Sequence, residues 1–157
     1  MENELQLVAN AIESGEMDEV SRLLKQNPAL LRARNESGWT ALELAIFNNE
    51  IEIVRHLLAE GANIDDKDDR GWTPLHEAAY NSTVEMIQVL LAFGANINAQ
   101  DNRGATPLYH AAESDFADIA RLLLENGADP NIRDNDGERP LDRARELGKV
   151  KVMSILA

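Results

Sequence analysis

The strongest constraint on the fold of this chain is a sequence pattern that recurs every 33 residues. Its clearest marker is a four-residue motif with Leu at the third place, which begins at Thr40, Thr73, Thr106 and Arg139. A Gly lies two residues before each motif, and a Leu-Leu pair followed by a Gly-Ala-Asn or Gly-Ala-Asp turn recurs downstream with the same step. A fixed period of this size is typical of proteins built from stacked units rather than around one closed core.

The first part of the chain carries a weaker copy of the pattern. Val20 and Leu23-Leu24 match later positions at a step of 34, and Asn27-Pro28 stands where the other units have Gly-Ala. We therefore predict one repeat domain of five units, with atypical capping units at both ends. The predicted units are residues 1–34, 35–67, 68–100, 101–133 and 134–157.

Each unit is predicted to be a pair of helices followed by a turn. In the third unit, Thr73 can cap a helix that starts at Pro74, where a missing amide hydrogen costs nothing. Small alanines give this first helix a narrow apolar face, and a second helix from Val84 carries a richer one before Gly94 ends it. The Asp- and Asn-rich runs between helix pairs predict projecting β-turns or short hairpins. Such a pair cannot bury its apolar surface alone, so neighbouring units must stack.

The third unit also carries a family resemblance. Its segments Gly-Trp-Thr-Pro-Leu-His-Glu-Ala-Ala and Leu-Leu-Ala-Phe-Gly-Ala-Asn resemble the ankyrin repeat, and the resemblance covers essentially the whole chain. It implies an all-α solenoid of stacked helix-turn-helix units with projecting β-turn tips. Tetratricopeptide repeats are the nearest rival, but they lack this helix start and the Gly-Ala-Asn turn. Ala41 and Arg139 depart from the pattern at helix starts, and a lost cap costs about 0.5–2 kcal/mol, which does not threaten the fold.

Composition narrows the possible functions. The chain has 28 acidic and 15 basic residues, a net charge of −13, and no cysteine. Disulfides and cysteine chemistry are therefore excluded, and binding to nucleic acid or to an anionic membrane is disfavoured. The acidic N-terminal sequence does not resemble a signal peptide, and no apolar run approaches the ~20 residues of a membrane span. We therefore expect a cytoplasmic protein that binds neither nucleic acid nor membranes.

The sequence contains no catalytic, phosphate-binding or metal-binding motif. His56, His76 and His110 lack catalytic spacing, and the resemblance implies a structural role for His76. An apparent calcium-binding loop around Gly71 is broken by Arg70 at a ligand position. We therefore predict a protein that is not an enzyme and that needs no cofactor or metal.

By resemblance, such an array binds proteins through its turn tips and the exposed face of each first helix. The predicted partner-binding residues are Trp39, Phe47, Asn48, Asp69, Arg70, Trp72, Tyr80, Asn81, Asn102, Arg103 and Glu113. Further surface positions expected by the same resemblance are Glu36, Ser37, Lys67, Gln100, Ala105 and Ser114. Four of the partner-binding residues are aromatic and occupy equivalent places in the second and third units, which predicts an aromatic strip suited to a binding hot spot.

Charge is unevenly distributed along the chain. Residues 35–133 carry a net charge of −11, whereas residues 134–157 are neutral. The acidic segment 65–69 could steer a partner with a basic surface, although such a run is also typical of a solvated turn. We predict a monomeric, non-catalytic scaffold that binds another protein through its concave surface. The alternative is a dedicated inhibitor or immunity protein that blocks a partner enzyme or toxin.

Overall fold

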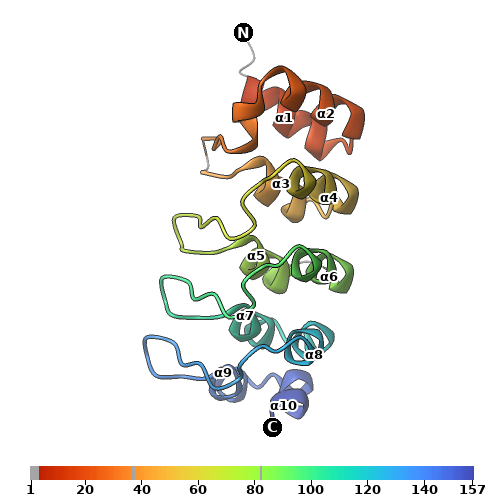
Figure 1. Ribbon diagram of the computed structural model, residues 1–157. Coiled ribbons are helices and arrows are strands. Elements are labelled where there is room, and N and C mark those ends of the chain that lie inside the picture. Colours follow the sequence, from red (N-terminus) through yellow and green to blue (C-terminus); the bar gives the residue numbers. More distant parts are fainter. Residues whose placement is uncertain (1–3, 37, 82) are drawn as a thin grey trace.

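The computed structural model describes residues 4–36, 38–81 and 83–157, which form helices and turns without strands. The first helices of the five pairs are α1 (Glu4–Glu13), α3 (Ala41–Phe47), α5 (Pro74–Asn81), α7 (Pro107–Glu113) and α9 (Pro140–Glu146). The second helices are α2 (Met17–Gln26), α4 (Ile51–Ala59), α6 (Val84–Ala92), α8 (Ala117–Glu125) and α10 (Val150–Leu156). The pairs stack in sequence order and their connecting turns project to one side (Figure 1), which confirms the predicted all-α solenoid. None of the helices described is long and apolar enough to cross a membrane.

The starts of the first helices follow from local side-chain chemistry. The backbone N–H of Glu43 donates to Thr40 Oγ1 at 3.3 Å, and Thr106 caps α7 in the same way. Before α9, where Arg139 replaces the threonine, the Asp142 carboxylate accepts from the Arg139 backbone N–H at 3.1 Å. The atypical last unit therefore keeps a capping hydrogen bond despite the substitution.

The apolar core runs between the helices along the whole stack. Leu75, Ala78 and Ala79 form the predicted narrow face of α5, and all three are fully buried. Because alanine side chains are short, the first helices pack directly against one another and more closely than the second helices do. The first helices lie on the side of the stack from which the turn tips project, and the second helices lie on the opposite side (Figure 1).

The connection after α2 differs from the others because it contains a short 3₁₀ helix, η1 (Pro28–Leu31). The side chain of Asn27 accepts from the backbone N–H of Ala29 at 3.2 Å, and Pro28 stands at the first helical position. Asn and Pro favour a helix start, so replacing the usual Gly-Ala with Asn27-Pro28 converts a turn into a helical segment.

Candidate functional site

The turn tips are shaped by an Asn or Asp at the start of each turn. Asp68 Oδ1 accepts from the backbone N–H groups of Arg70 and Trp72 at 2.9 and 2.8 Å. Asp101 and Asp134 make the equivalent pairs of bonds in the next two tips. These side-chain-to-backbone bonds hold each tip as a tight projecting turn.

Neighbouring tips are also joined to each other. The backbone N–H of Asn102 donates to Arg70 O at 3.0 Å, and its side-chain amide donates to Asp69 O at 2.9 Å. One unit later, Asn135 donates in the same way to Arg103 O at 2.8 Å and to Asn102 O at 3.0 Å. Asn102 is exposed as predicted, but its amide group is already engaged within the protein. The equivalent positions of Asn102 and Asn135 were a sequence signal for this structural role.

Gly71 allows this close approach between tips. Its φ is +76°, and a Cβ atom there would lie 2.4 Å from Asn102 Oδ1 and 2.7 Å from Asn102 N. Gly104 makes a similar approach to Asn135, with distances of 2.7 and 3.0 Å to the same two atoms. At Gly71 and Gly104 a glycine is therefore required both by the turn and by the neighbouring tip.

The four predicted aromatic residues form two edge-to-face pairs, one in each unit. The ring centroids of Trp39 and Phe47 are 5.0 Å apart, and those of Trp72 and Tyr80 are 5.3 Å apart. Phe47 is 55% exposed and Tyr80 is 47% exposed, whereas both tryptophans are half-buried. Phe47 and Tyr80 are therefore the rings of the two pairs that a partner protein can contact.

Trp72 also packs between two units. Its Nε1–H donates to Asp101 Oδ2 at 3.1 Å, and its ring centroid lies 4.4 Å from that of His110. The Arg70 guanidinium lies 3.9 Å above the Trp72 ring centroid, in a cation–π contact. The sequence prediction treated Trp72 only as a surface residue and missed this packing role.

The polar residues predicted around the aromatics are held by neighbours on their own helices or on the next one. Asn48 and Asn81 each donate to a residue one helical turn earlier. Arg103 donates to Glu113 at 3.2 Å, and Arg143 donates to the same carboxylate at 3.0 Å. Glu113 therefore links its own unit to the next, and its side chain is mostly buried.

Ala105 corrects one sequence prediction, because it is only 1% exposed and does not belong to the surface. Its N–H donates to Asp101 and its carbonyl meets His76 Nε2 at 3.1 Å, which places it between units. His76 Nδ1 accepts from the Thr73 N–H at 3.1 Å, so the proton of this neutral ring is on Nε2 and donates to Ala105 O. Burial lowers the pKa of His76 to about 4, and His76 therefore has the structural role that the resemblance implied.

A buried charge cluster surrounds His110. Its Nε2 lies 2.9 Å from Asp101 Oδ2, and its Nδ1 lies 3.2 Å from Glu113 Oε2, without good hydrogen-bond alignment. Burial opposes the charge on the ring, but the two carboxylates outweigh it and raise the pKa of His110. The His110 contact holds the pKa of Glu113 at about 2. Because the ring is fully buried, this cluster within the fourth unit has no access to a substrate.

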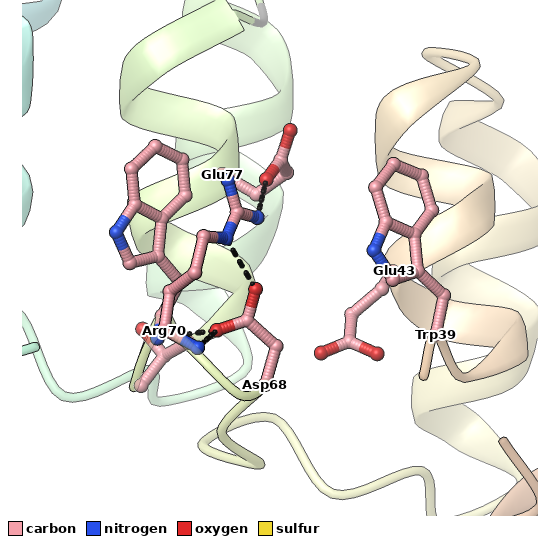
Figure 2. A pocket seen from close by; sticks show the side chains of 7 residues that line it. Trp39, Glu43, Asp68, Arg70 and Glu77 are labelled. Atoms are coloured by element: carbon pink, nitrogen blue, oxygen red, sulfur yellow. Dashed lines mark hydrogen bonds and ion pairs between the residues drawn. The ribbon is translucent and has the colours of Figure 1, made fainter. Parts of the chain in front are cut away.

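A small pocket lies between the tip turns and the first helices of the second and third units. It has a volume of about 10 Å³, room for about one water molecule. Figure 2 shows its lining from close by, with the Arg70 guanidinium next to Glu77 and Asp68, and Trp39 and Glu43 facing them. Its lining residues are Trp39, Glu43, Asp68, Arg70, Trp72, Thr73 and Glu77. Small-molecule sites usually enclose several hundred Å³, so this pocket can admit only the tip of a ligand.

Glu43 is one of two buried acids in this pocket, and unlike Glu77 it is not bound by Arg70. Its Oε2 accepts from the N–H and hydroxyl of Thr40 at 2.7 and 2.9 Å, whereas its Oε1 is buried without a hydrogen-bond partner. Burial raises the pKa of Glu43, and the nearby Asp68 charge adds to this effect, although Thr40 and Arg34 oppose it. The sequence prediction missed Glu43 as a site residue, and its spacing from Thr40 indicated only a helix cap.

Most carboxylates of the acidic segment 65–69 have partners within the protein. Asp65 Oδ1 accepts a backbone N–H of the following turn at 2.9 Å, and Asp66 and Asp68 pair with arginines at 2.9 and 2.7 Å. Asp69 is exposed, and its carboxylate has no hydrogen-bond or ion-pair partner among the described residues. The segment is therefore more neutralised than its sequence suggests, with Asp69 left open to solvent.

The described residues do not gather three His, Asp or Glu side chains in a way that could hold a metal ion. In the calcium-loop pattern, Asp68 and Glu77 both bind Arg70, at 2.7 and 2.9 Å. The Arg70 guanidinium therefore occupies the two carboxylates that a calcium ion would need as ligands. Ser37, expected at the surface, lies outside the described residues.

Comparison with known proteins identifies what the chain is similar to. The family model described as ankyrin repeats (3 copies) matches residues 2–68, 60–134 and 100–157, nearly the whole chain. A protein of Rickettsia bellii (strain RML369-C), whose name proposes it as an ankyrin repeat protein, is 44% identical over 46 residues. That match covers 29% of this chain, and the chain spans only 13% of the length of the Rickettsia protein.

Proposed function

This chain belongs to the ankyrin-repeat family, whose repeats generally mediate protein–protein interaction, and we propose that it is a non-catalytic module that binds a partner protein through its concave surface. The observation that carries this proposal is the pair of exposed rings, Phe47 and Tyr80, at equivalent places on adjacent first helices. Each ring rests on a half-buried tryptophan, so little side-chain freedom is lost when a partner covers it.

The rigidity of the tips supports binding through the same surface. The tips are tied to one another by backbone and amide hydrogen bonds, which keeps Asp69, Asn102 and Arg103 at fixed spacings. A preorganised surface binds more tightly because fewer groups must be ordered on association. The predicted site residues come from α3, α5, α7 and their tips, and we propose these elements together as the binding surface.

The charge of the central units favours a partner with a basic surface. Residues 35–133 carry a net charge of −11. Attraction of this kind raises association rates and is screened by salt. We expect the association rate of the partner to fall as ionic strength rises, and a rate insensitive to salt would contradict this part of the proposal.

Affinity capture from cells that produce the protein, followed by calorimetry with the purified partner, tests the proposal. The variant Phe47→Ala/Tyr80→Ala removes both exposed rings, and Phe93→Ala is the matched control because Phe93 is 42% exposed at the end of a second helix. Loss of a hot-spot ring costs about 2 kcal/mol, roughly thirtyfold in affinity. We expect that loss in the double variant and none in Phe93→Ala, and equal affinity of all three proteins would refute the proposed surface.

The same purified pair separates a scaffold from an inhibitor. If the partner is an enzyme or a toxin, its activity is measured at increasing ratios of this protein. Loss of activity at a one-to-one ratio assigns an inhibitory role, whereas full activity in the complex assigns a scaffold.

A further inference from the structure

The pocket between the second and third units has the chemistry of a subsite for one particular side chain. We propose that it takes the ammonium group of a lysine from the partner protein, with Glu43 as the acceptor. This inference rests on the proposed function and names the partner group that the acidic surface recognises.

The unpartnered oxygen of Glu43 is the first observation. The Glu43 side chain is 8% exposed, and its Oε1 atom is buried with no hydrogen-bond partner. A buried oxygen without a partner is costly, and nearly all such groups in proteins find one. Figure 2 shows this carboxylate on the side of the pocket opposite Arg70. A donor that enters the pocket would therefore complete the hydrogen bonding of Glu43.

The charges of the pocket indicate that the donor is a cation. The lining contains three carboxylates, those of Glu43, Asp68 and Glu77, against the single guanidinium of Arg70. Arg70 pairs with Asp68 at 2.7 Å and with Glu77 at 2.9 Å, so these two acids share its single positive charge. Glu43 is approached only on its Oε2 side, by Arg34 Nη1 at 3.5 Å. The weakest of these three ion pairs is thus that of Glu43, the acid whose Oε1 atom has no partner.

The size of the pocket distinguishes lysine from arginine. A volume of about 10 Å³ holds about one water molecule. An ammonium group has a single heavy atom and three donors, so it can replace a water there, whereas a guanidinium has four heavy atoms in a plane. An arginine would have to displace Trp39 or Arg70, which already cover the space around it.

The aromatic walls suit the rest of a lysine side chain. Trp39 and Trp72 both line the pocket, and Phe47 packs on Trp39 at its outer edge. Indole rings attract cations and also cover the methylene groups of a lysine stem. The lysine would thus enter past the aromatic pair of the second unit and end at Glu43.

Tryptophan fluorescence provides a direct test, because the only two tryptophans of the chain both line the pocket. The probes are capped pentapeptides Gly-Ser-Lys-Ser-Gly and matched peptides with arginine or norleucine at the centre. We expect a saturable change in emission with the lysine peptide, binding about tenfold weaker with arginine because of steric misfit, and none with norleucine. Equal binding of the lysine and arginine peptides, or no saturable change with lysine, would overturn the inference.

Two charge variants test the role of Glu43. Glu43→Gln keeps the size of the side chain and its capping ability, since Gln also serves at this helix position. Glu60→Gln is the matched control, because Glu60 is exposed at the end of α4 and lies outside the proposed surface. We expect Glu43→Gln to weaken lysine binding about tenfold or more and Glu60→Gln to change it by less than about twofold. Equal effects of the two variants would show general charge attraction instead of a subsite.

The experiments distinguish failure of the lysine subsite from failure of the proposed function. If Phe47→Ala/Tyr80→Ala abolishes partner binding while Glu43→Gln leaves it intact, the subsite is refuted and the concave surface stands. If neither set of variants alters partner binding, the proposed surface itself is wrong. The comparison of lysine, arginine and norleucine peptides on the unmodified protein needs no variant, so a folding defect in Glu43→Gln does not remove the test.

Discussion

Substituting Gly71 with alanine tests the contact between neighbouring tips. An alanine at a φ of +76° is strained, which costs about 1–2 kcal/mol. Its Cβ would also lie 2.4 Å from Asn102 Oδ1 and 2.7 Å from the backbone N of Asn102. The second distance involves backbone, so the neighbouring tip has to move and the hydrogen bond from Asn102 to Arg70 weakens.

Gly38 supplies the matched control at the same place in the repeat. Its φ is +81°, and the nearest atom to a Cβ there is Asp69 Oδ2 at an ordinary 3.6 Å. Gly38→Ala therefore carries the backbone strain alone, about 1–2 kcal/mol. Gly71→Ala adds a steric cost of about 1–3 kcal/mol, and loss of the hydrogen bond adds about 1 kcal/mol. We expect Gly71→Ala to be the more destabilising by about 2 kcal/mol or more.

Urea unfolding followed by circular dichroism measures this difference. With a dependence on urea of about 2 kcal/mol per M, the unfolding midpoint of Gly71→Ala should lie about 1 M below that of Gly38→Ala. Gly104→Ala should fall between them, because its closest distance is 2.7 Å. If Gly71→Ala and Gly38→Ala unfold at the same urea concentration, the contact between tips does not constrain this glycine and the reasoning fails.

The remaining predictions concern buried groups. His110→Gln should destabilise the protein by about 3–5 kcal/mol, because Asp101 and Glu113 lose their buried partner. Since the pKa of His110 is raised from 6.5 on folding, its stabilisation is full below pH 6.5 and is lost as the pH rises through the folded pKa. The difference in unfolding free energy between wild type and His110→Gln should therefore shrink from pH 6 to pH 9, and a constant difference would contradict the assignment. The His76 ring should stay neutral with its proton on Nε2 down to about pH 4 in NMR titrations, and protonation near pH 6.5 would show that it is not buried as described. Leu75→Ala should cost about 2–5 kcal/mol in urea unfolding, because Leu75 is fully buried in α5, and a cost below about 1 kcal/mol would contradict this packing.

The helices and tips were predictable because their determinants are local and repeat with the period. The start of α5 at Pro74 and the buried face of Leu75, Ala78 and Ala79 follow from residue type and spacing within one unit. The 3₁₀ helix η1 was not predicted, since its cause is a local replacement that occurs in one unit only. A repeat pattern therefore predicts the structure that its copies share. It predicts less well the structure of a unit whose sequence departs from the other copies.

The candidate site was less predictable because it depends on contacts between units. The bond from Trp72 to Asp101 joins residues 29 positions apart, and its existence depends on which way the indole ring turns. Burial of Ala105 and the free oxygen of Glu43 likewise depend on the packing of adjacent units. Residue type indicated which side chains could bind a partner, but only the packing shows which of them are already occupied.

The hydrogen-bonded joints between neighbouring tips affect how such a chain can change in length during evolution. Asn102 and Asn135 bind the preceding tip with the same two donors, so these two joints share one docking geometry. A duplicated stretch of 33 residues would find matching donors and acceptors on both sides, as would the ends left by a deletion of the same length. Gene duplication can thus lengthen or shorten the array by whole units, whereas gain or loss of one or two residues within a tip would misplace the donors and acceptors of that tip and break its contacts with the tips on either side.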